Sequence, residues 1–454
     1  MNNRILLINP PMTYLTSVEP IRLAQPMGLC YIAAVLEKEG YDVKILDAHA
    51  EGYHNRVKNG DKTQVGLTEQ EISLKIAEFN PAIVGVGSMF SDQYNNSKMV
   101  CRVAKETNSE IVTCMGGVHP TMVPDEVLKD PNVNYVIRGE AEYSFRDFCD
   151  WLIKKKDINP KKIDGLNFNP KEQWIQNLDE LPFPARHLLN LPLYFEAGRA
   201  YREPSKRKRA FPIITSRCCP AFCNFCATHT MQGSYRQRSV DNVIAEIEYL
   251  VKTCGMEEIY FLDDALAFGN FREILKKMVE NKYDLAWHGA NGIAIYSLDD
   301  ELIDLFAKSG CYKVILSIES GVQKTLNYMR KPVKLVKTAE IIKKIKDSGL
   351  KVESMFVIGL PCESKEDILN TIKFAESLQL DYVSFPLATP FKGTDFYKDC
   401  FEKGCLAGEY KFENLKFGIG NIKTDEWGPE FVETVRKEAW HRINKIKPED
   451  EVDN

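Results

Sequence analysis

The stretch "SRCCPAFCNFCATHT", residues 216–230, places four cysteines within nine positions. It follows the apolar run "FPIITS" (211–216), which predicts a buried β-strand that ends where the cysteines begin. The thiols are too close together for ordinary disulfide geometry, and a buried apolar cluster does not need so many of them. The loop after this strand is therefore predicted to hold a metal or a metal cluster.

Two registers are possible for the ligands of this loop. In one, Cys219, Cys223 and Cys226 have the spacing C-x3-C-x2-C, and in the other Cys218 replaces Cys219 with a longer first gap. A structural zinc site takes four protein ligands, usually in C-x2-C pairs, and no second pair occurs nearby. Three thiolates on one tight loop fit an iron-sulfur cluster instead, with its fourth iron open to another ligand.

The chain around this loop alternates strand-like and helix-like segments. Between residues 211 and 395, six apolar runs alternate with amphipathic stretches: "FPIITS", "EEIYFLDD", "LAWHGAN", "YKVILSIES", "KVESMFVIGLP" and "YVSFPLATP". This alternation predicts a partial (β/α)6 barrel with its chemistry at the carboxyl ends of the strands. Residues 396–454 contain the helical segment "PEFVETVRKEAWHRINKI" and predict a small, mostly helical C-terminal region.

The first 155 residues show a second α/β alternation. Five β-branched runs, "RILLINP", "YDVKILDA", "AIVGVGSMFS", "EIVTCMGG" and "NYVIRGE", are separated by amphipathic stretches. They predict a doubly wound, Rossmann-like parallel sheet in residues 1–155, with a ligand crevice at the carboxyl ends of its strands. Residues 156–210 are rich in proline and predict a linker. Its run "KRKR" (206–209) is interpreted as a solvated face, with contact to an anionic substrate as the alternative.

Composition and charge are those of an ordinary globular protein. The 454 residues carry a net charge of -5, which does not indicate a nucleic-acid partner. No apolar run approaches the roughly 20 residues that span a bilayer, and the start lacks the apolar region of a signal peptide. We therefore expect a cytoplasmic protein without a membrane span. Six single cysteines in apolar or helical contexts are interpreted as small hydrophobic residues: Cys30, Cys101, Cys114, Cys149, Cys254 and Cys311.

The segment "CPAFCNFC" resembles the cysteine loop of the radical S-adenosylmethionine (SAM) enzymes. The resemblance implies that Cys219, Cys223 and Cys226 bind a [4Fe-4S] cluster whose open iron is chelated by the amino and carboxylate groups of SAM. Cys218 stands where such sequences often carry glycine, which leaves open a local change in cluster environment, with a plain structural thiol as the default interpretation.

The same resemblance implies SAM-binding roles for residues that follow the predicted strands. Phe225 would pack near adenine, and "FLDDA" would contact the methionine amino group through Asp263 and Asp264. The segment "LSIES" would lie near the ribose and methionine moieties, "NYMRK" would contact the carboxylate, and "VIGLP" would lie beside adenine. The residues concerned are Ser317, Glu319, Ser320, Arg330, Ile358 and Gly359.

Segments of the first half resemble the cobalamin-binding domain of the cobalamin-dependent radical SAM enzymes. They are "LLINPP", "QPMGLCYIAAVLEKEGYDVKILDA", "GVGSMFS", "MGGVHPTMVPDEVL" and "VIRGEAE", and with "LDELPFPAR" the resemblance covers about residues 3–395. A generic doubly wound sheet with glycine turns is the alternative. The resemblance implies cobalamin-binding roles for Pro10, Gly28, Leu29, Ser88, Met89, Ser91, Gly116, Gly117, His119 and Glu140.

The segment "DAHAEG" (47–52) has the spacing D-x-H-x-x-G, in which the histidine ligates cobalt in some corrinoid proteins. There the motif follows the first strand, whereas here it follows the second predicted strand. The cobalamin-dependent radical SAM class usually leaves cobalt without a protein histidine. We therefore expect His49 to be an ordinary surface histidine, with ligation of cobalt as the alternative.

Taken as a whole, the resemblance implies a cobalamin-dependent radical SAM methyltransferase acting on an unactivated carbon or phosphorus centre. A 5'-deoxyadenosyl radical would abstract a substrate hydrogen, cobalamin would supply the methyl group, and a second SAM would restore it. The substrate would be a small molecule, peptide or protein, and the reductant a flavodoxin or ferredoxin.

Three other functions remain open. A cobalamin-dependent oxidative cyclase or ring-rearranging enzyme would keep both cofactors but transfer no methyl group. An RNA methylthiotransferase would need three further cluster cysteines in its first domain, a spacing that the cysteines before residue 155 do not match, and the tail "KPEDEVDN" (447–454) is acidic. A non-enzymatic cobalamin carrier or sensor would not require the SAM-side segments.

Overall fold

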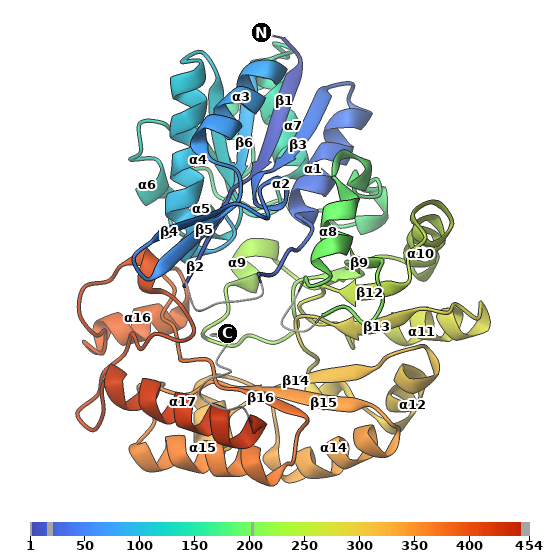
Figure 1. The fold of residues 1–454 in the computed structure, drawn as a ribbon, viewed down its shortest axis with the longest axis vertical. Helices are drawn as coiled ribbons and strands as arrows, with labels where there is room; N and C mark the ends of the chain where they lie inside the picture. Colours follow the sequence, from blue (N-terminus) through green and yellow to red (C-terminus); the bar gives the residue numbers. More distant parts are fainter. Residues whose placement is uncertain (1, 16–20, 201–203, 446–454) are drawn as a thin grey trace. The chain divides into compact units, whose positions relative to one another are not determined.

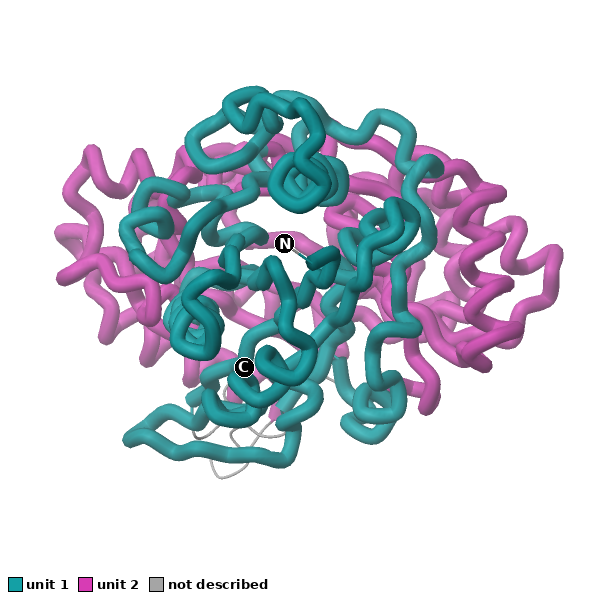
Figure 2. The backbone as a smooth tube through the Cα atoms, turned by 90° about the horizontal axis from the view of Figure 1, so that it is seen from above, with its two compact units in different colours: residues 1–204, 230–233, 453 teal, residues 205–229, 234–452, 454 magenta. Residues whose placement is uncertain are grey.

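A computed structural model describes residues 2–15, 21–200 and 204–445. The chain forms two compact units (Figure 2). The first consists mainly of Met1–Pro204 and also takes Thr230–Gly233, and the second consists of Ser205–His229 and Ser234–Val452. The predicted boundaries at residues 155, 210 and 395 are finer than this division and stay predictions. The acidic tail at 447–454 lies outside the described residues.

The first unit is built on a five-stranded parallel sheet with the order β3-β1-β6-β7-β8. β1 lies inside the sheet and is almost wholly buried, as its apolar sequence "RILLIN" requires. The order confirms the predicted doubly wound class. The strands are β1 (Arg4–Asn9), β3 (Asp42–Asp47), β6 (Ile83–Gly87), β7 (Val112–Gly116) and β8 (Tyr135–Ile137).

Helices cover both faces of this sheet (Figure 1). Helices α1 (Met27–Lys38) and α7 (Glu142–Leu152) pack together, and α3 (Glu69–Phe79) packs on α4 (Tyr94–Thr107). The chain leaves β1 and β6 in opposite directions along the sheet, so the crevice of such a fold lies at the carboxyl ends of these two strands. Short helices after the strand ends complete the unit: α2 (Ala48–Glu51), α5 (Val118–Met122) and α6 (Pro124–Val127).

The first unit also contains a small antiparallel sheet that the sequence analysis missed. β4 (Arg56–Asn59) and β5 (Lys62–Val65) form a hairpin, and β5 also pairs with β2 (Met12–Leu15). The signal was available, because Gly60 occupies the two-residue turn with a φ of 61° that favours glycine.

Among the described residues between the predicted domains, no strand occurs from 156 to 200. Prolines restrict it to short turns of 3-10 helix, η2 (Pro160–Lys162), η3 (Leu178–Glu180) and η4 (Arg186–Leu188), followed by helix α8 (Leu191–Ala197). The described part of this segment, up to Pro204, belongs to the first compact unit.

The second unit is a partial barrel of six parallel strands in chain order. Two three-stranded sheets, β13-β12-β9 and β14-β15-β16, are joined by parallel bridges from Trp287 to Cys311 and from Ile293 to Leu316. This confirms the predicted (β/α)6 architecture. The strands are β9 (Ala210–Ile213), β12 (Glu258–Phe261), β13 (Ala286–Gly289), β14 (Lys313–Glu319), β15 (Lys351–Phe356) and β16 (Tyr382–Ser384).

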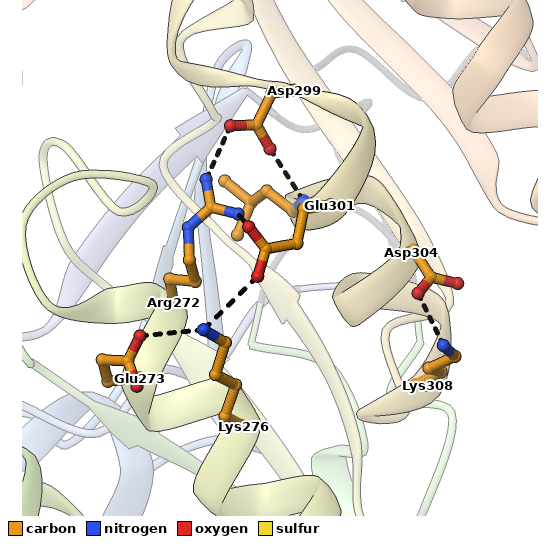
Figure 3. Close-up of polar contacts among 8 residues, drawn as sticks. Arg272, Glu273, Lys276, Asp299, Glu301, Asp304 and Lys308 are labelled. Carbon is orange, nitrogen blue, oxygen red and sulfur yellow. Dashed lines mark hydrogen bonds and ion pairs between the residues drawn. The ribbon is translucent and has the colours of Figure 1, made fainter.

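Amphipathic helices flank the barrel strands (Figure 1), and two of them carry an exposed ion-pair network (Figure 3). Arg272 contacts Asp299 at 2.7 Å and Glu301 at 2.6 Å, which ties α11 to the start of α12. Exposed pairs of this kind add little stability, so the apolar faces of the helices carry most of the packing. The helices are α10 (Val240–Cys254), α11 (Phe271–Glu280), α12 (Asp300–Lys308), α13 (Gln323–Tyr328), α14 (Thr338–Asp347) and α15 (Lys365–Ser377), with α16 (Asp395–Glu402) and α17 (Pro429–Asn444) after the barrel.

All thirteen cysteines are free thiols. The prediction that the single cysteines act as small hydrophobic residues is confirmed for five of them, which are buried: Cys30, Cys101, Cys114, Cys149 and Cys311. Cys254, at the end of α10, is half-buried. Among the described residues, no helix is long and apolar enough to span a membrane.

The expectation that His49 lies at the surface is wrong. Its side chain is 2% exposed, and its Nε2 lies 3.3 Å from the hydroxyl of Tyr14. Burial, followed by the charge of Arg56, lowers the pKa of His49 to about 4. The ring is therefore neutral near pH 7, and it shares a hydrogen bond with the Tyr14 hydroxyl.

The Asp47 carboxylate of the D-x-H-x-x-G segment makes structural hydrogen bonds, in place of the one that a metal-binding histidine usually makes. Such a histidine donates its second ring N–H to a carboxylate or carbonyl. Here the Asp47 carboxylate accepts from Asn9 at 2.8 Å, from Tyr194 and from the backbone of Ala50. An added Cβ at Gly52 would lie 2.0 Å from the backbone of Gly66, so only glycine fits there.

The buried His49 predicts that acid destabilises the first unit. Its folded pKa of about 4 lies below the ordinary 6.5, so the unfolded chain takes up the proton first as the pH falls. The free energy of unfolding should therefore decrease from pH 6.5 towards pH 4, with a contribution of about 2 kcal/mol lost by pH 5. Urea denaturation of His49→Gln and wild type at pH 7 and pH 5 measures this contribution. The same change at the exposed His187 is the control, and an equal acid sensitivity of His49→Gln and wild type would contradict the prediction.

Candidate functional site

The cysteine loop begins at the carboxyl end of the first barrel strand. Its two ends are closed by a short antiparallel ladder between β10 (Ser216–Arg217) and β11 (Arg236–Gln237). Between them the chain carries the four cysteines and helix α9 (Thr228–Gln232). The ladder holds the loop over the barrel end where cofactors bind in folds of this type.

The four cysteines of the loop differ in exposure. Cys218 is fully buried with a φ of 67°, whereas Cys219 and Cys223 are half-buried and Cys226 is exposed. The three accessible thiols interact electrostatically, because Cys226 raises the pKa of both Cys219 and Cys223 after the larger effect of burial. In the described part of the chain, no three His, Cys, Asp or Glu side chains are grouped around a point that one metal ion could occupy. A cluster binds each thiolate through a different iron, so its sulfur ligands need not meet at one point.

The tip of the loop is held by Asn224. Its backbone N–H donates to Met329 at 3.1 Å, its side-chain amide donates to the carbonyl of Tyr328 at 2.9 Å, and its own carbonyl accepts from Phe396 at 2.9 Å. These bonds attach the loop to the end of α13 and the start of α16. Phe225, predicted to lie near adenine, is half-buried beside this anchor.

Asp263 follows β12 and organises the start of the loop. Its Oδ1 accepts four hydrogen bonds, at 2.5 to 3.0 Å, from the backbone and hydroxyl groups of Thr215 and Ser216. Its Oδ2 is buried and has no hydrogen-bond partner among the described residues. Burial raises the pKa of this carboxyl, and the hydrogen bonds oppose the shift. The neighbouring Asp264 is exposed.

The fourth barrel strand ends in a buried ion pair. Glu319, with a φ of 71°, contacts Lys331 at 2.9 Å, and both side chains are almost inaccessible. Burial lowers the pKa of Lys331, but Glu319 and Cys223 outweigh it, so that the pKa is raised. Lys331 in turn opposes the effect of burial, which raises the pKa of Cys223 to about 11. The ammonium group is therefore a permanent positive charge beside the cysteines.

The structure gives the two predicted serines of this strand different surroundings. Ser317 is buried, and an added Cβ at Gly292 would lie 2.5 Å from its hydroxyl. The Ser320 hydroxyl lies 3.1 Å from Thr371 of α15 and accepts from the backbone of Val322. Ser320 is thus engaged in helix packing.

Arg330, predicted to bind the SAM carboxylate, lies on the exposed side of the chain turn that buries Lys331. Its guanidinium pairs with Asp395 at 2.6 Å, and both side chains are more than half exposed. Its φ of 56° turns the chain so that consecutive basic residues point to different surroundings. Lys331, a buried cation close to Cys223, was not selected from the sequence.

The end of β15 is shaped by a buried carboxyl that was also missed. The Glu363 Oε2 accepts from the backbone N–H groups of Gly359 and Leu360, both at 2.9 Å. Burial raises the pKa of Glu363 to about 8. Gly359 has a φ of 84°, and the side chain of Ile358 is fully buried. The Ile358 N–H donates to Pro386 at 3.2 Å and its carbonyl accepts from Ala388 at 2.9 Å, so the backbone and the side chain of Ile358 both belong to the core.

In the first unit, the predicted ligand residues meet at the carboxyl ends of β6 and β7. The backbone N–H of Ser88 donates to Gly116 at 2.8 Å, and its carbonyl accepts from His119 at 3.1 Å. An added Cβ at Gly117, whose φ is 111°, would lie 2.7 Å from that carbonyl. Glycine is required here because the two loops are in direct contact.

Polar atoms line the same edge of the sheet. The Ser88 hydroxyl is buried and has no hydrogen-bond partner in the described part of the chain. The buried His119 lies 3.0 Å from the Ser91 hydroxyl, and its ring packs against Tyr94. These contacts fix the loop after β6 against the loop after β7.

The remaining residues predicted to bind cobalamin differ in burial and in position. Pro10 is buried after β1, Gly28 and Met89 are exposed, and the Leu29 methyl groups lie beside Gly87 at the end of β6. Glu140 is buried and accepts from the backbone of Ile175 at 3.1 Å. Glu140 therefore attaches the segment around Ile175 to the chain that follows β8.

Two family models match the chain. A B12 binding domain matches residues 22–148, and the Radical SAM superfamily matches residues 213–375. These regions contain the β6–β7 edge and the cysteine loop described above. The two matches together therefore cover both candidate sites.

Individual proteins resemble the chain over nearly its full length. It is 33% identical to cytidylyl-2-hydroxyethylphosphonate methyltransferase of Streptomyces wedmorensis, over 96% of this chain and 89% of the relative. It is 30% identical to an uncharacterized methyltransferase of Pyrococcus horikoshii, over 87% and 82% of the two chains.

The fold resembles that of a solved methyltransferase. The radical SAM methyltransferase TsrM of Kitasatospora setae, solved with cobalamin and a [4Fe-4S] cluster, matches 89% of this chain and 75% of its own. The TM-score is 0.71 at 17% identity. With both domain models matched and a full-length relative at 33% identity, the chain belongs to the family of cobalamin-dependent radical SAM methyltransferases.

Proposed function

We propose that the protein methylates an unactivated carbon centre of a small molecule, with the accessible cysteines of the 216–230 loop as its cluster ligands. The observation that carries this proposal is the difference among the four thiols. Cys219, Cys223 and Cys226 are accessible on one anchored loop, and Cys218 is buried. This difference favours the register that begins at Cys219.

The buried polar groups around the loop fit SAM. The amino group of SAM is a donor, and the Asp263 Oδ2 is a buried acceptor without a partner among the described residues. The carboxylate of SAM needs a cation, and Lys331 is a buried ammonium beside Cys223. We therefore assign Lys331 to the carboxylate ahead of Arg330, whose guanidinium is exposed and paired with Asp395.

Other residues of the barrel would complete the SAM site. Adenine would lie beside Gly359, whose backbone N–H is fixed by Glu363, with Phe225 as the predicted aromatic neighbour. Ser317 and Glu319 stay candidates for the ribose and methionine moieties. The hydroxyl of Ser320 is already engaged with Thr371 and Val322, so we assign it a packing role.

The β6–β7 edge of the first unit fits cobalamin. The Ser88 hydroxyl, which has no hydrogen-bond partner among the described residues, and the close backbone approach at Gly117 suit a large ligand with many amide groups. His49 is not assigned to cobalt, because its ring nitrogen contacts Tyr14 and the Asp47 carboxylate has other donors. His119 and Ser91 would orient the two loops that contact the ligand.

When bound, the cluster would supply the electron for reductive cleavage of SAM, and cobalamin would supply the methyl group. The protein orients these groups and excludes water from the radical. Asp263, Lys331 and Asn224 would hold SAM and the loop in place, as their buried contacts permit. No side chain needs to act as a nucleophile.

The substrate class follows from the relatives as a proposal. The Streptomyces wedmorensis relative is named for a nucleotide-linked phosphonate, so phosphonates with and without a nucleotide are the first candidates. A flavodoxin or ferredoxin stays the predicted reductant, and a cytoplasmic location stays a prediction. The main alternative is an oxidative or rearranging enzyme that uses the same cofactors without methyl transfer.

The cluster assignment predicts a sharp difference between adjacent cysteines. Cys219→Ala, Cys223→Ala and Cys226→Ala should each abolish the [4Fe-4S] cluster, because a three-thiolate site cannot lose a ligand. Cys218→Ala should retain it, since this thiol is buried away from the others. Iron and sulfide per chain after anaerobic reconstitution measure the outcome. Loss of iron from Cys218→Ala with retention in Cys219→Ala would show that the register is wrong.

The Asp263 assignment is tested by an isosteric change. Asp263→Asn keeps the oxygen that binds Thr215 and Ser216 and replaces the partnerless Oδ2 with an amide. Loss of a charged hydrogen bond to SAM should lower the rate of 5'-deoxyadenosine formation about tenfold or more. Reductive cleavage of SAM with dithionite measures this rate at equal cluster content. Asp304→Asn, on the exposed face in Figure 3, is the control, and an unchanged rate in Asp263→Asn argues against the assignment.

Methyl transfer predicts the stoichiometry of two by-products. With a competent substrate, reductant and cobalamin, 5'-deoxyadenosine and S-adenosylhomocysteine should rise in parallel with the methylated product, because radical formation and methyl supply use separate SAM molecules. Mass spectrometry with methyl-labelled SAM measures all three, and Cys223→Ala is the inactive control. Altered product and 5'-deoxyadenosine without S-adenosylhomocysteine would favour the oxidative or rearranging alternative.

A further inference from the structure

One histidine connects the end of the cysteine loop to residues near its start. His229, three residues after Cys226, has its Nε2 2.9 Å from the carbonyl oxygen of Ala221 and its Nδ1 3.5 Å from the sulfur of Cys218. Its ring also stacks on Phe222, with centroids 4.0 Å apart and planes 7° from parallel. All these groups belong to the same segment of the second unit.

The chemistry of the partners determines the direction of the hydrogen bond to Ala221. A carbonyl oxygen can only accept, so Nε2 carries a proton and donates it to Ala221. In the tautomer with its proton on Nε2, Nδ1 has a lone pair that accepts the S–H of Cys218, which also lies 3.8 Å from the carbonyl of Cys219. One ring thus connects a thiol donor and a carbonyl acceptor that lie on either side of Cys219.

The contacts of His229 fall at the positions that determine where the three thiols lie. Cys218 directly precedes the first proposed ligand, and Ala221 and Phe222 lie between the first and second ligands. Cys218 has a φ of 67°, a conformation that residues other than glycine rarely adopt. The thiol contact with His229 is an interaction that glycine at this position would lack.

The stacking contact alone is a weak restraint. Phe222 is 67% exposed, so its ring gains little from burial against His229. The other anchor of the loop is Asn224, which holds the tip between the second and third thiols. In the span from Cys218 to Cys223, the two hydrogen bonds of His229 thus join residues that are distant along the loop, in addition to the local contact of the Cys218 thiol with the carbonyl of Cys219.

We propose that His229 is a positioning residue for the iron-sulfur cluster, which sets the conformation of the ligand loop through Ala221 and the thiol of Cys218. The inference rests on the proposed function, because it takes Cys219, Cys223 and Cys226 as the ligands. His229 itself contacts neither cluster nor SAM in this scheme. Its loss weakens the retention of the cluster and leaves the fold of the barrel intact.

The test compares variants that remove or retain each hydrogen bond in the full-length chain. His229→Phe keeps an aromatic ring on Phe222 and removes both bonds. His229→Gln places an amide near the position of Nε2 and can still donate to Ala221, whereas His229→Asn places one near Nδ1. Cys218→Ala removes only the thiol donor. His187→Phe, the same change at an exposed histidine, is the matched control.

Three readouts separate a positioning role from a general effect on folding. They are the melting temperature of the chain without cluster, the iron and sulfide content after anaerobic reconstitution, and the rate at which a ferrous chelator removes iron. We expect His229→Phe to melt within a few degrees of wild type and to lose iron about fivefold faster or more, as loss of one or two ordinary hydrogen bonds allows. His229→Gln should recover most of the wild-type rate, and Cys218→Ala should show an intermediate rate.

The outcomes distinguish this inference from the proposed function. Wild-type protein that assembles no four-iron cluster contradicts the proposed function itself. A cluster that loads fully and leaves His229→Phe and wild type at the same rate overturns the inference alone. If His229→Phe does not fold, His229→Asn and Cys218→Ala decide the matter: wild-type iron retention in both overturns the inference, and faster loss in both supports it.

Discussion

A single buried carboxylate oxygen determines where the cysteine loop begins. The Asp263 Oδ1 accepts four hydrogen bonds from Thr215 and Ser216, at the point where the first barrel strand passes into the loop. Removing a carboxylate from water is costly unless hydrogen bonds compensate for it, so these donors and the carboxylate hold one another in place. The same geometry leaves the Asp263 Oδ2 without a partner among the described residues, available to a ligand.

Buried charged groups determine the electrostatics at the carboxyl end of the barrel strands. Glu319 and Lys331 form an ion pair that is nearly inaccessible to water, and Lys331 also lies near Cys223. Breaking such a pair by removing one partner strands a buried charge, so the pair is strongly constrained. A fixed positive charge beside thiols suits a site that takes up thiolates and a carboxylate. At the end of the next strand, the buried Glu363 carboxylate fixes the backbone by accepting hydrogen bonds from Gly359 and Leu360.

The first unit builds its site from backbone rather than charge. Gly117 lets the loop after β7 lie directly on Ser88, and His119 connects that loop to Ser91. A hydroxyl without a partner among the described residues, next to a close backbone approach, suits a large ligand with many amide groups. In both units the site lies at the carboxyl ends of parallel strands, because βα connections bring variable loops together there.

The sequence alone predicted the class of both folds and the loop that carries the cysteines, whereas the strand order β3-β1-β6-β7-β8 came from the structure. The predicted features depend on local periodicity and on ligand spacing, which are properties of neighbouring residues. The antiparallel hairpin of β4 and β5 was missed despite Gly60, because its strands are short and polar. Asp263, which the family resemblance assigned to the SAM amino group, is buried after β12, and its role stays a prediction.

Only the tertiary structure decided which side chains are buried and which pairs meet. His49, expected at the surface, is buried against Tyr14, and the consecutive residues Arg330 and Lys331 face solvent and a buried carboxylate respectively. Cys218 and Cys219 are likewise adjacent in sequence but differ in burial, because the left-handed turn at Cys218 directs its thiol towards His229. Burial and pairing depend on residues distant in the chain and on single φ angles, and neither leaves a periodic signal in the sequence.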